Sequence, residues 1–158
     1  MNIALFLQMA AEACPDRCAL THNGSKYSYT ELYVAAKSAA NKFVRSQCKF
    51  VSLIGESSPA VPIALMGAAM AGLPYVPINY RLGEEQILGL LARIDPAYLI
   101  TDNPKFSLST NHLIIQKSIN FITDVLGDDA PEIDWCEDPS AVAVQLFTSG
   151  TTGNPKAA

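Results

Sequence analysis

The chain has 158 residues, of which 49% are hydrophobic and 16% charged, and its 11 basic and 15 acidic side chains give a net charge of −4. That length predicts about one domain with a substantial buried core, and the composition excludes general disorder. Because the chain is weakly acidic and has no basic stripe, we expect no nucleic acid among its partners.

The cysteines and the first residues indicate the cellular compartment of the protein. Cys14 and Cys18 are close in sequence, but no second cysteine pair or histidine cluster completes a metal site, so we expect no metal ligands and reduced thiols. Segment 1–13 has no basic residue before its apolar run and contains Glu12, which favours an amphipathic helix over a signal peptide. We therefore expect a cytoplasmic protein, with attachment at the periphery of a membrane as an open alternative.

The first third of the chain predicts two helices and a hairpin. Helical spacing of apolar residues predicts helices at 3–13 and from 29 to about 46, and short apolar runs predict strands at 17–21 and 26–28. Asn23-Gly24 between the two runs is the dipeptide most typical of a tight hairpin turn. Ser28 and Glu31 form a capping box, in which the Ser28 hydroxyl accepts from the Glu31 amide and the carboxylate reaches back.

The middle of the chain alternates strands with helices. Apolar runs predict strands at 50–54, 75–78, 97–101 and 113–115, and apolar spacing predicts helices at 60–71 and 84–94. Gly72 lies where a helix end favours the left-handed backbone, and Leu88 and Leu91 should face inward. This order predicts an α/β fold with a mostly parallel sheet and helices on both faces.

The 24 uncharged residues 57–80 are long enough to span a bilayer. Prolines and glycines such as Pro62, Gly72 and Pro74 divide them into a short helix, a turn and a strand. Each piece is too short to cross a membrane, so we expect no transmembrane span.

Segment 127–139 is strongly acidic and has no basic residue. Its acids are Asp128, Asp129, Glu132, Asp134, Glu137 and Asp138. Their spacing does not follow the alternation of a calcium-binding EF-hand loop. We therefore interpret the segment as an acidic, solvated surface linker.

The run with the clearest chemical content follows a strand predicted at 141–147. It reads Thr148-Ser149-Gly150-Thr151-Thr152-Gly153-Asn154-Pro155-Lys156. Glycines let backbone amides approach an anion, hydroxyls donate to its oxygens and a lysine neutralises it, so 148–156 is interpreted as a phosphate-binding loop. Its spacing differs from that of a Walker A loop, and a surface turn of the same composition is the alternative.

The string Phe147–Lys156 closely resembles the signature loop T-S-G-T-T-G-x-P-K-G of the acyl-adenylate-forming, or AMP-binding, superfamily of acyl-CoA synthetases, adenylation domains and luciferases. Ala71–Asn79 resembles the A-G-x-x-x-V-P-[IL]-[ND] segment of that superfamily, and Tyr27–Leu32 resembles the start of one of its helices. The resemblance covers the chain from end to end and is weakest between 103 and 139. Ala157 stands where the family usually has glycine, a departure that bears on the fine positioning of the phosphates.

The resemblance implies a two-step ligase. In the family, a carboxylate attacks the α-phosphate of Mg-ATP to give an acyl-adenylate and pyrophosphate, and a thiol then displaces AMP. A carboxylic acid would be the substrate, with ATP, Mg²⁺ and coenzyme A as cofactors and co-substrates. By motif matching, the loop residues that would hold or shape the β- and γ-phosphate site are Thr148, Ser149, Gly150, Thr151, Thr152, Gly153 and Lys156.

One run points to a branch of the superfamily. Pro77–Leu82 reads P-I-N-Y-R-L and looks more like the acyl-CoA branch, which includes the fatty-acid-CoA ligases, than like the P-I-D-P of amino-acid-activating domains. We therefore expect an acyl-CoA synthetase. An amino-acid-activating adenylation domain is the alternative.

Members of the family continue for several hundred residues beyond this loop, through the acyl pocket, the metal-binding acid and a C-terminal lysine. The resemblance therefore implies that 1–158 form the N-terminal part of the large AMP-binding domain. We expect this part to lack a complete catalytic set, to be inactive alone and to self-associate through surfaces that the remainder would cover. The alternative is a non-catalytic relative that binds a nucleotide or a partner protein.

Overall fold

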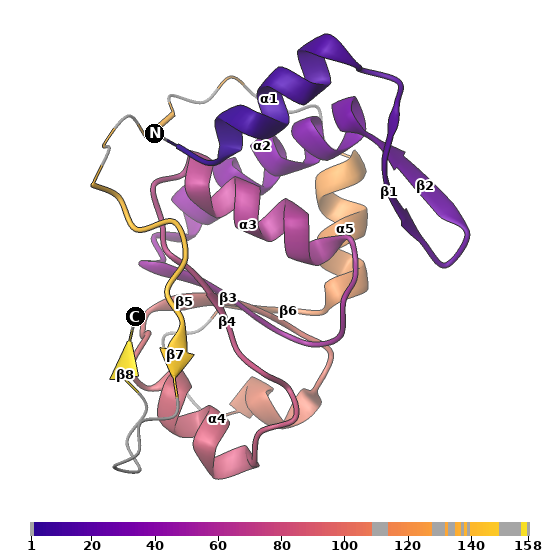
Figure 1. Ribbon diagram of the computed structural model, residues 1–158. Coiled ribbons are helices and arrows are strands. Elements are labelled where there is room, and N and C mark those ends of the chain that lie inside the picture. The colour runs from indigo at the N-terminus through magenta and orange to yellow at the C-terminus, as the bar shows by residue number, and fades with distance from the viewer. Residues whose placement is uncertain are drawn as a thin grey trace.

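Helices and strands alternate along the chain in the computed structural model, which describes residues 2–108, 114–127, 132, 135–136, 138, 140–148 and 156–157 (Figure 1). The helices are α1 (Ala4–Ala13), α2 (Tyr29–Ser46), α3 (Ala60–Met70), α4 (Glu84–Leu91) and α5 (Ser118–Gly127), with a 3₁₀ turn η1 at Pro104–Leu108. The strands are β1 (Cys18–His22), β2 (Ser25–Ser28), β3 (Phe50–Ile54), β4 (Tyr75–Pro77), β5 (Ala97–Thr101), β6 (Ile114–Gln116), β7 (Phe147–Thr148) and β8 (Lys156–Ala157).

A four-stranded parallel sheet lies at the centre of the fold. Its strand order is β4-β3-β5-β6, and every neighbouring pair is parallel. The two inner strands, β3 and β5, pair along their whole length, from Phe50 opposite Ala97 to Ile54 opposite Thr101. Strands that are buried on both faces read as continuous apolar runs, which is why both bounds match the sequence prediction. The predicted α/β class is confirmed.

Helices cover both faces of the sheet, as predicted. Figure 1 shows α1, α2, α3 and α5 on one side of the sheet and α4 on the other. The first side encloses a core that includes Phe43 and Phe121, and the second a core that includes Ile87 and Leu91. The side chains of β5 alternate between the two cores: Tyr98 and Ile100 belong to the first, and Ala97 and Leu99 to the second.

The predicted local signals near the N-terminus are confirmed. Strands β1 and β2 form an antiparallel hairpin, and its turn residues Asn23 and Gly24 have φ angles of 48° and 81°. The Ser28 hydroxyl accepts from the Glu31 amide at 3.1 Å, and the Glu31 carboxylate accepts from the Ser28 amide at 2.7 Å. This capping box satisfies two backbone groups at the start of α2. Gly72, just after α3, has a φ of 70°, as its predicted position requires.

Helix α4 is shorter than predicted, because it ends at Leu91 and not at 94. The amides of Arg93 and Ile94 donate to carbonyls three residues earlier, which closes the helix with a tight turn before Pro96. Leu91 is buried as expected, whereas Leu88 is half-buried. The buried face of the helix therefore includes its neighbours Ile87 and Leu90 instead.

Helices α2 and α3 pack at close range through a glycine. A Cβ atom at Gly67 would lie 2.8 Å from the Cβ of Ala39 and 2.9 Å from the carbonyl oxygen of Ala36. Contacts under 3 Å do not fit between two helix backbones, so only glycine allows this approach. The alanine-rich sequences of both helices leave room for it.

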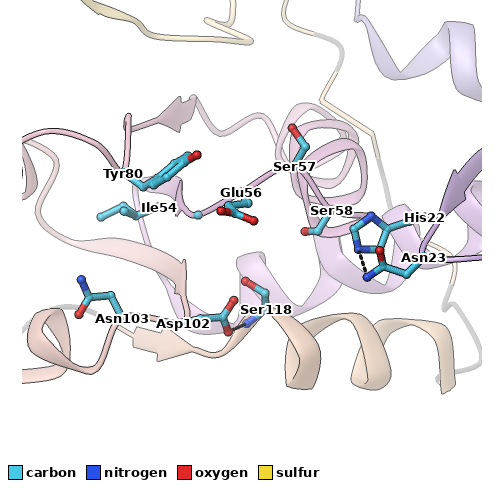
Figure 2. Close-up of a pocket in the computed structure, with 11 residues that line it drawn as sticks. His22, Asn23, Ile54, Glu56, Ser57, Ser58, Tyr80, Asp102, Asn103 and Ser118 are labelled. Carbon is cyan, nitrogen blue, oxygen red and sulfur yellow. Dashed lines mark hydrogen bonds between the residues drawn. The ribbon is translucent and has the colours of Figure 1, made fainter.

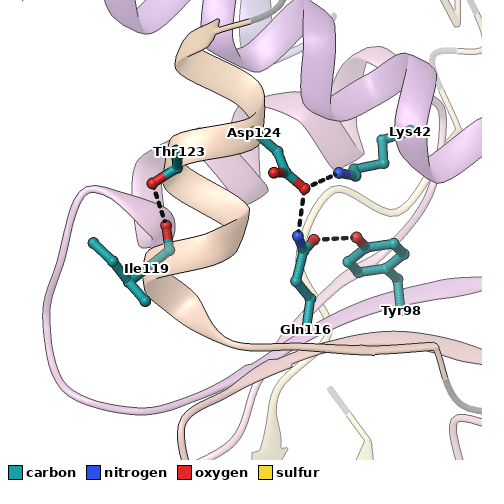
Figure 3. A network of polar contacts seen from close by, with 6 residues as sticks. All are labelled: Lys42, Tyr98, Gln116, Ile119, Thr123 and Asp124. Carbon is teal, nitrogen blue, oxygen red and sulfur yellow. Dashed lines mark hydrogen bonds and ion pairs between the residues drawn. The ribbon is translucent and has the colours of Figure 1, made fainter.

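Helix α5 was not predicted from the sequence, and a polar network joins it to the sheet and to α2 (Figure 3). Asp124 accepts from Lys42 on α2 at 2.6 Å and from the side-chain amide of Gln116 on β6 at 2.6 Å. The Tyr98 hydroxyl donates to Gln116. Hydrogen bonds from Lys42 and then Gln116 lower the pKa of Asp124, whereas burial and then the charge of Asp124 raise the pKa of Tyr98.

The described residues of the acidic segment 127–139 contact the helical layer. Trp135 packs beside Tyr33 with ring centroids 6.4 Å apart, and the Cys136 amide donates to the Met70 carbonyl at 3.1 Å. The exposed Glu132 carboxylate forms an ion pair with Lys37 at 3.4 Å. This segment, predicted as a solvated linker, therefore holds a half-buried tryptophan against α2.

Segment 57–80 contains α3, the turn after it and β4. In the part of the chain that the structure describes, no helix combines the length and the apolar character that crossing a bilayer requires.

Candidate functional site

The phosphate-loop string begins in β7 and ends in β8. These two strands pair antiparallel, with Thr148 opposite Lys156 and Phe147 opposite Ala157. The predicted site residues between them, Ser149, Gly150, Thr151, Thr152 and Gly153, lie outside the described residues. The structure thus places the first and the last of the predicted site residues opposite one another.

The segment that leads into β7 is hydrogen-bonded to the edge of the parallel sheet. The Tyr75 amide donates to the Ala143 carbonyl at 3.0 Å, and the Gln145 amide donates to the Tyr75 carbonyl at 2.9 Å. Val144 thereby forms a parallel bridge with Tyr75. The strand predicted at 141–147 is reduced to this bridge and to β7, because Pro77 has no N–H with which to continue the ladder along β4.

Tyr75 is a rigid anchor for this segment. Its side chain is buried in the first core, and burial raises its pKa to about 12, so the phenol stays neutral at physiological pH. Its backbone pairs with β3 on one side and with segment 143–145 on the other. The segment that leads into β7 is therefore bonded to a residue of β4 that is itself fixed by β3.

A second anchor comes from the opposite layer of the fold. The guanidinium of Arg93, which follows α4, lies 4.8 Å from the centroid of the Phe147 ring. Phe147 is half-buried and packs against the second core. Figure 1 shows β7 and β8 beside the layer that holds α4, in agreement with this contact.

The antiparallel register limits what the string can do. Residues directly opposite in such a pair have Cα atoms about 4.5–5.5 Å apart, so the chain that leaves Thr148 returns to the same place at Lys156.

Sequence reasoning missed the residues that hold β7 and the segment before it. Tyr75 and Arg93 contact residues that are more than fifty positions away in the sequence, and no local pattern marks either of them. It also missed polar side chains at the carboxyl edge of the sheet, Glu56 after β3 and Asp102 after β5. Their signal was readable, because polar residues just beyond parallel strands commonly line a ligand crevice.

Comparison with known families gives a match over nearly the whole chain. The family described as AMP-binding enzyme matches residues 7–158. Surfactin synthase subunit 3 of Bacillus subtilis (strain 168) is 30% identical over 159 residues, which span 98% of this chain and 12% of that protein. The D-alanine–D-alanyl carrier protein ligase of Staphylococcus aureus (strain MRSA252) is 26% identical over 151 residues, which span 95% of this chain and 30% of that protein.

Solved structures share the fold. The N-terminal subdomain of Klebsiella oxytoca NpsA in complex with 3-hydroxyanthranilyl-AMSN superposes with a TM-score of 0.78 at 24% identity over 99% of this chain and 39% of that one. ATP-bound MatB from Rhodopseudomonas palustris gives 0.80 at 22% identity over 99% of this chain and 34% of that one. At these identities the likeness concerns the fold.

The named relatives test two expectations from the sequence, the adenylate-forming family and its acyl-CoA branch. They agree with an adenylate-forming family and do not support the acyl-CoA branch, since the protein names are those of a surfactin synthase and a carrier protein ligase. This chain spans less than a third of the length of either relative.

Proposed function

This chain belongs to the AMP-binding enzyme family, and from that membership we propose that it forms the N-terminal part of an enzyme that uses ATP to join a carboxylic acid to a thiol. A carboxylate oxygen attacks the α-phosphorus, the bond to the bridging oxygen breaks, and pyrophosphate leaves. The thiol sulfur then attacks the acyl carbon, AMP leaves with the electron pair, and the thiol loses its proton. Both steps depend on positioning and charge stabilisation.

The loop 148–156 is the part of this chain that we assign to the nucleotide. Hydroxyls donate to the β- and γ-phosphates, a lysine offsets their charge, and glycines allow the backbone to approach; these residues are Thr148, Ser149, Gly150, Thr151, Thr152, Gly153 and Lys156. The observation that carries the proposal is the family match over residues 7–158, and the register of β7 and β8, which sets Thr148 opposite Lys156, supports it.

Mg²⁺ would accompany ATP and offset the charge of its phosphates. Among the described residues, no group of three or more histidine, cysteine or acidic side chains could hold a metal ion. We assign no ligand for the metal in the described part of this chain.

The relatives favour one class of carboxylic acid and one kind of acceptor thiol. By its name, the Staphylococcus aureus relative joins D-alanine to D-alanyl carrier protein. We favour an amino acid as the substrate and a carrier-protein thiol as the acceptor, because this relative and the surfactin synthase subunit both align over nearly the whole chain. Pro77–Leu82 resembles the acyl-CoA branch and keeps a fatty acid and coenzyme A as the competing pair.

Carboxylate-dependent exchange of labelled pyrophosphate into ATP tests this function in the whole protein that contains the chain. Panels of amino acids and of fatty acids should separate the two substrate classes, and exchange with an amino acid is the expected result. Lys156→Ala should reduce exchange by about 10²–10³-fold, as the loss of one charge-stabilising group typically does. Lys26→Ala, on the exposed hairpin, is the matched control and should leave exchange unchanged.

Two results would contradict the proposal. Exchange with no carboxylate, together with stabilisation of the protein by ATP, would indicate a nucleotide-binding relative without chemistry. Exchange that Lys156→Ala does not alter would place the phosphates away from the loop 148–156.

A further inference from the structure

A cavity of about 490 Å³ lies at the carboxyl edge of the parallel sheet (Figure 2). It opens above the ends of β3 and β5, the two neighbours from which the chain departs to opposite faces. After β3 the chain continues into α3 on the first face, whereas after β5 it continues into η1, whose Phe106 belongs to the core on the second face. In open α/β sheets, such a switch point is where ligands bind.

Two carboxylates face the cavity from the two strand ends. Glu56 follows β3 and Asp102 follows β5. Asp102 is held in place, because one of its oxygens accepts from the Ser118 amide at 2.9 Å. No lysine or arginine is present among the described residues that line the cavity, so its wall is negatively charged.

The Ser118 side chain is an independent sign of a ligand. The residue is only 9% exposed, and its hydroxyl makes no hydrogen bond with any described residue. Figure 2 shows the hydroxyl of Ser118 pointing into the cavity, on the side of Glu56. A buried hydroxyl without a partner is unfavourable, and a ligand in the cavity would supply that partner.

The lining narrows the ligand class. A metal ion would need more ligands than two carboxylates, and the described residues contain no such group. A phosphate would meet two acids and no cation. The remaining walls combine Ile54 and Tyr80 with polar side chains, and Ser57, Ser58 and Asn103 among the latter provide partners for hydroxyl groups. The volume is that of a small-molecule site.

We propose that this cavity binds a small hydroxylated organic cation. Its ammonium group lies between Glu56 and Asp102, and one of its hydroxyls bonds to the Ser118 hydroxyl. The serines beyond β3 bond to its other hydroxyls. The site goes beyond the proposed adenylation function and does not depend on it, because none of the described lining residues belongs to β7 or β8 or is Tyr75 or Arg93.

Three probes with a common hexose ring and different charge test the site. Glucosamine, glucose and glucose 6-phosphate are titrated into this chain, and amide shifts at 55–58 and 102–103 are followed by heteronuclear NMR. We expect saturable shifts with glucosamine, at least about tenfold weaker binding of glucose because it lacks the charge-assisted contacts, and no saturation with glucose 6-phosphate.

Variants identify the groups involved. Glu56→Gln and Ser118→Ala should each weaken glucosamine binding, the first by about tenfold or more. Glu85→Gln, an exposed carboxylate on α4 outside the cavity, is the matched control and should bind as the original chain does. Glu56→Gln is the primary variant because Glu56 is exposed and makes no contact on which the fold depends, whereas Asp102 also holds the start of α5.

The outcomes are decisive in either direction. Saturation by glucosamine that Glu56→Gln weakens and Glu85→Gln does not weaken supports the site. Tighter binding of glucose 6-phosphate than of glucosamine would reverse the assigned charge and overturn the proposal. The same holds for an absence of saturable glucosamine shifts, or for binding that Glu56→Gln leaves unaltered.

Discussion

Arg93 and Phe147 are 54 residues apart in sequence and in contact in the fold, with the guanidinium 4.8 Å from the centroid of the ring. Arg93 follows the helix that covers the second face of the sheet, and Phe147 is the first residue of the phosphate-loop string. The contact therefore ties the entrance of the loop to the body of the fold, at a place where β7 and β8 have only two residues each.

Arg93→Ala should loosen β7. A cation–π contact contributes about 0.5–2 kcal/mol, so we expect a similar fall in the free energy of unfolding and faster hydrogen exchange at 145–148. Arg93→Lys should restore part of the effect, because an ammonium group also binds an aromatic face. Arg45→Ala, at the exposed end of α2, is the control; equal exchange at 145–148 in both alanine variants would contradict this role.

Gly67→Ala should destabilise the chain by about 1–3 kcal/mol, since its new methyl would overlap Ala39 and the Ala36 carbonyl oxygen across the α2–α3 contact. Gly89→Ala on α4 provides the opposite case, because a Cβ there meets no atom within 4 Å. That variant should gain about 0.5–1 kcal/mol from helix propensity alone. Urea unfolding of both variants measures the difference, and a loss of stability in Gly89→Ala as large as that in Gly67→Ala would refute the close-packing argument.

The Asp124 network should make stability depend on acidity. Its pKa is lower in the folded chain than in the unfolded chain, so the unfolded state binds a proton first as the pH falls. The stabilisation is therefore fully present above the unfolded pKa of an aspartate, near 4, and is lost as the pH falls through the folded value. The side chain is 45% exposed, so solvent screening holds the effect below about 1 kcal/mol.

Asp124→Asn isolates this contribution. The variant should be less stable than the original chain at neutral pH, and the two should converge in acid, as measured by urea midpoints across the pH range. Added salt should narrow the difference at neutral pH. A gap that stays constant from neutral to acidic pH would show that the ionic contact to Lys42 contributes nothing.

Much of the fold was predictable because its signals are local. The capping box at Ser28, the Asn23-Gly24 turn and the apolar strands β3 and β5 each depend on residues within a few positions of one another. The contacts that hold segment 143–147 are different, since Tyr75 binds segment 143–145 across nearly seventy residues and Arg93 binds Phe147 across more than fifty. A single sequence has no pattern that pairs such positions, and only the tertiary fold brings them together.

Helix α5 is an intermediate case. Phe121 and Val125 are four residues apart, a spacing that indicates a helix, and both are fully buried. The exposed apolar residues Ile119 and Leu126 lie outside this buried face. Its packing is non-local, because Phe121 stacks on Phe43 with an interplanar angle of 9° and centroids 5.9 Å apart.

Phe121→Ala should therefore be among the most damaging single changes in the helical layer. The ring is fully buried against Phe43 and Tyr98, so its removal leaves a cavity and should lower the free energy of unfolding by about 3–5 kcal/mol. Phe121→Leu, which keeps most of the volume, should cost about 1–1.5 kcal/mol. Ile119→Ala on the exposed side of α5 is the control and should change stability by less than about 0.5 kcal/mol. Urea unfolding decides the matter: if Phe121→Ala and Ile119→Ala are equally mild, α5 does not depend on the aromatic cluster for its position.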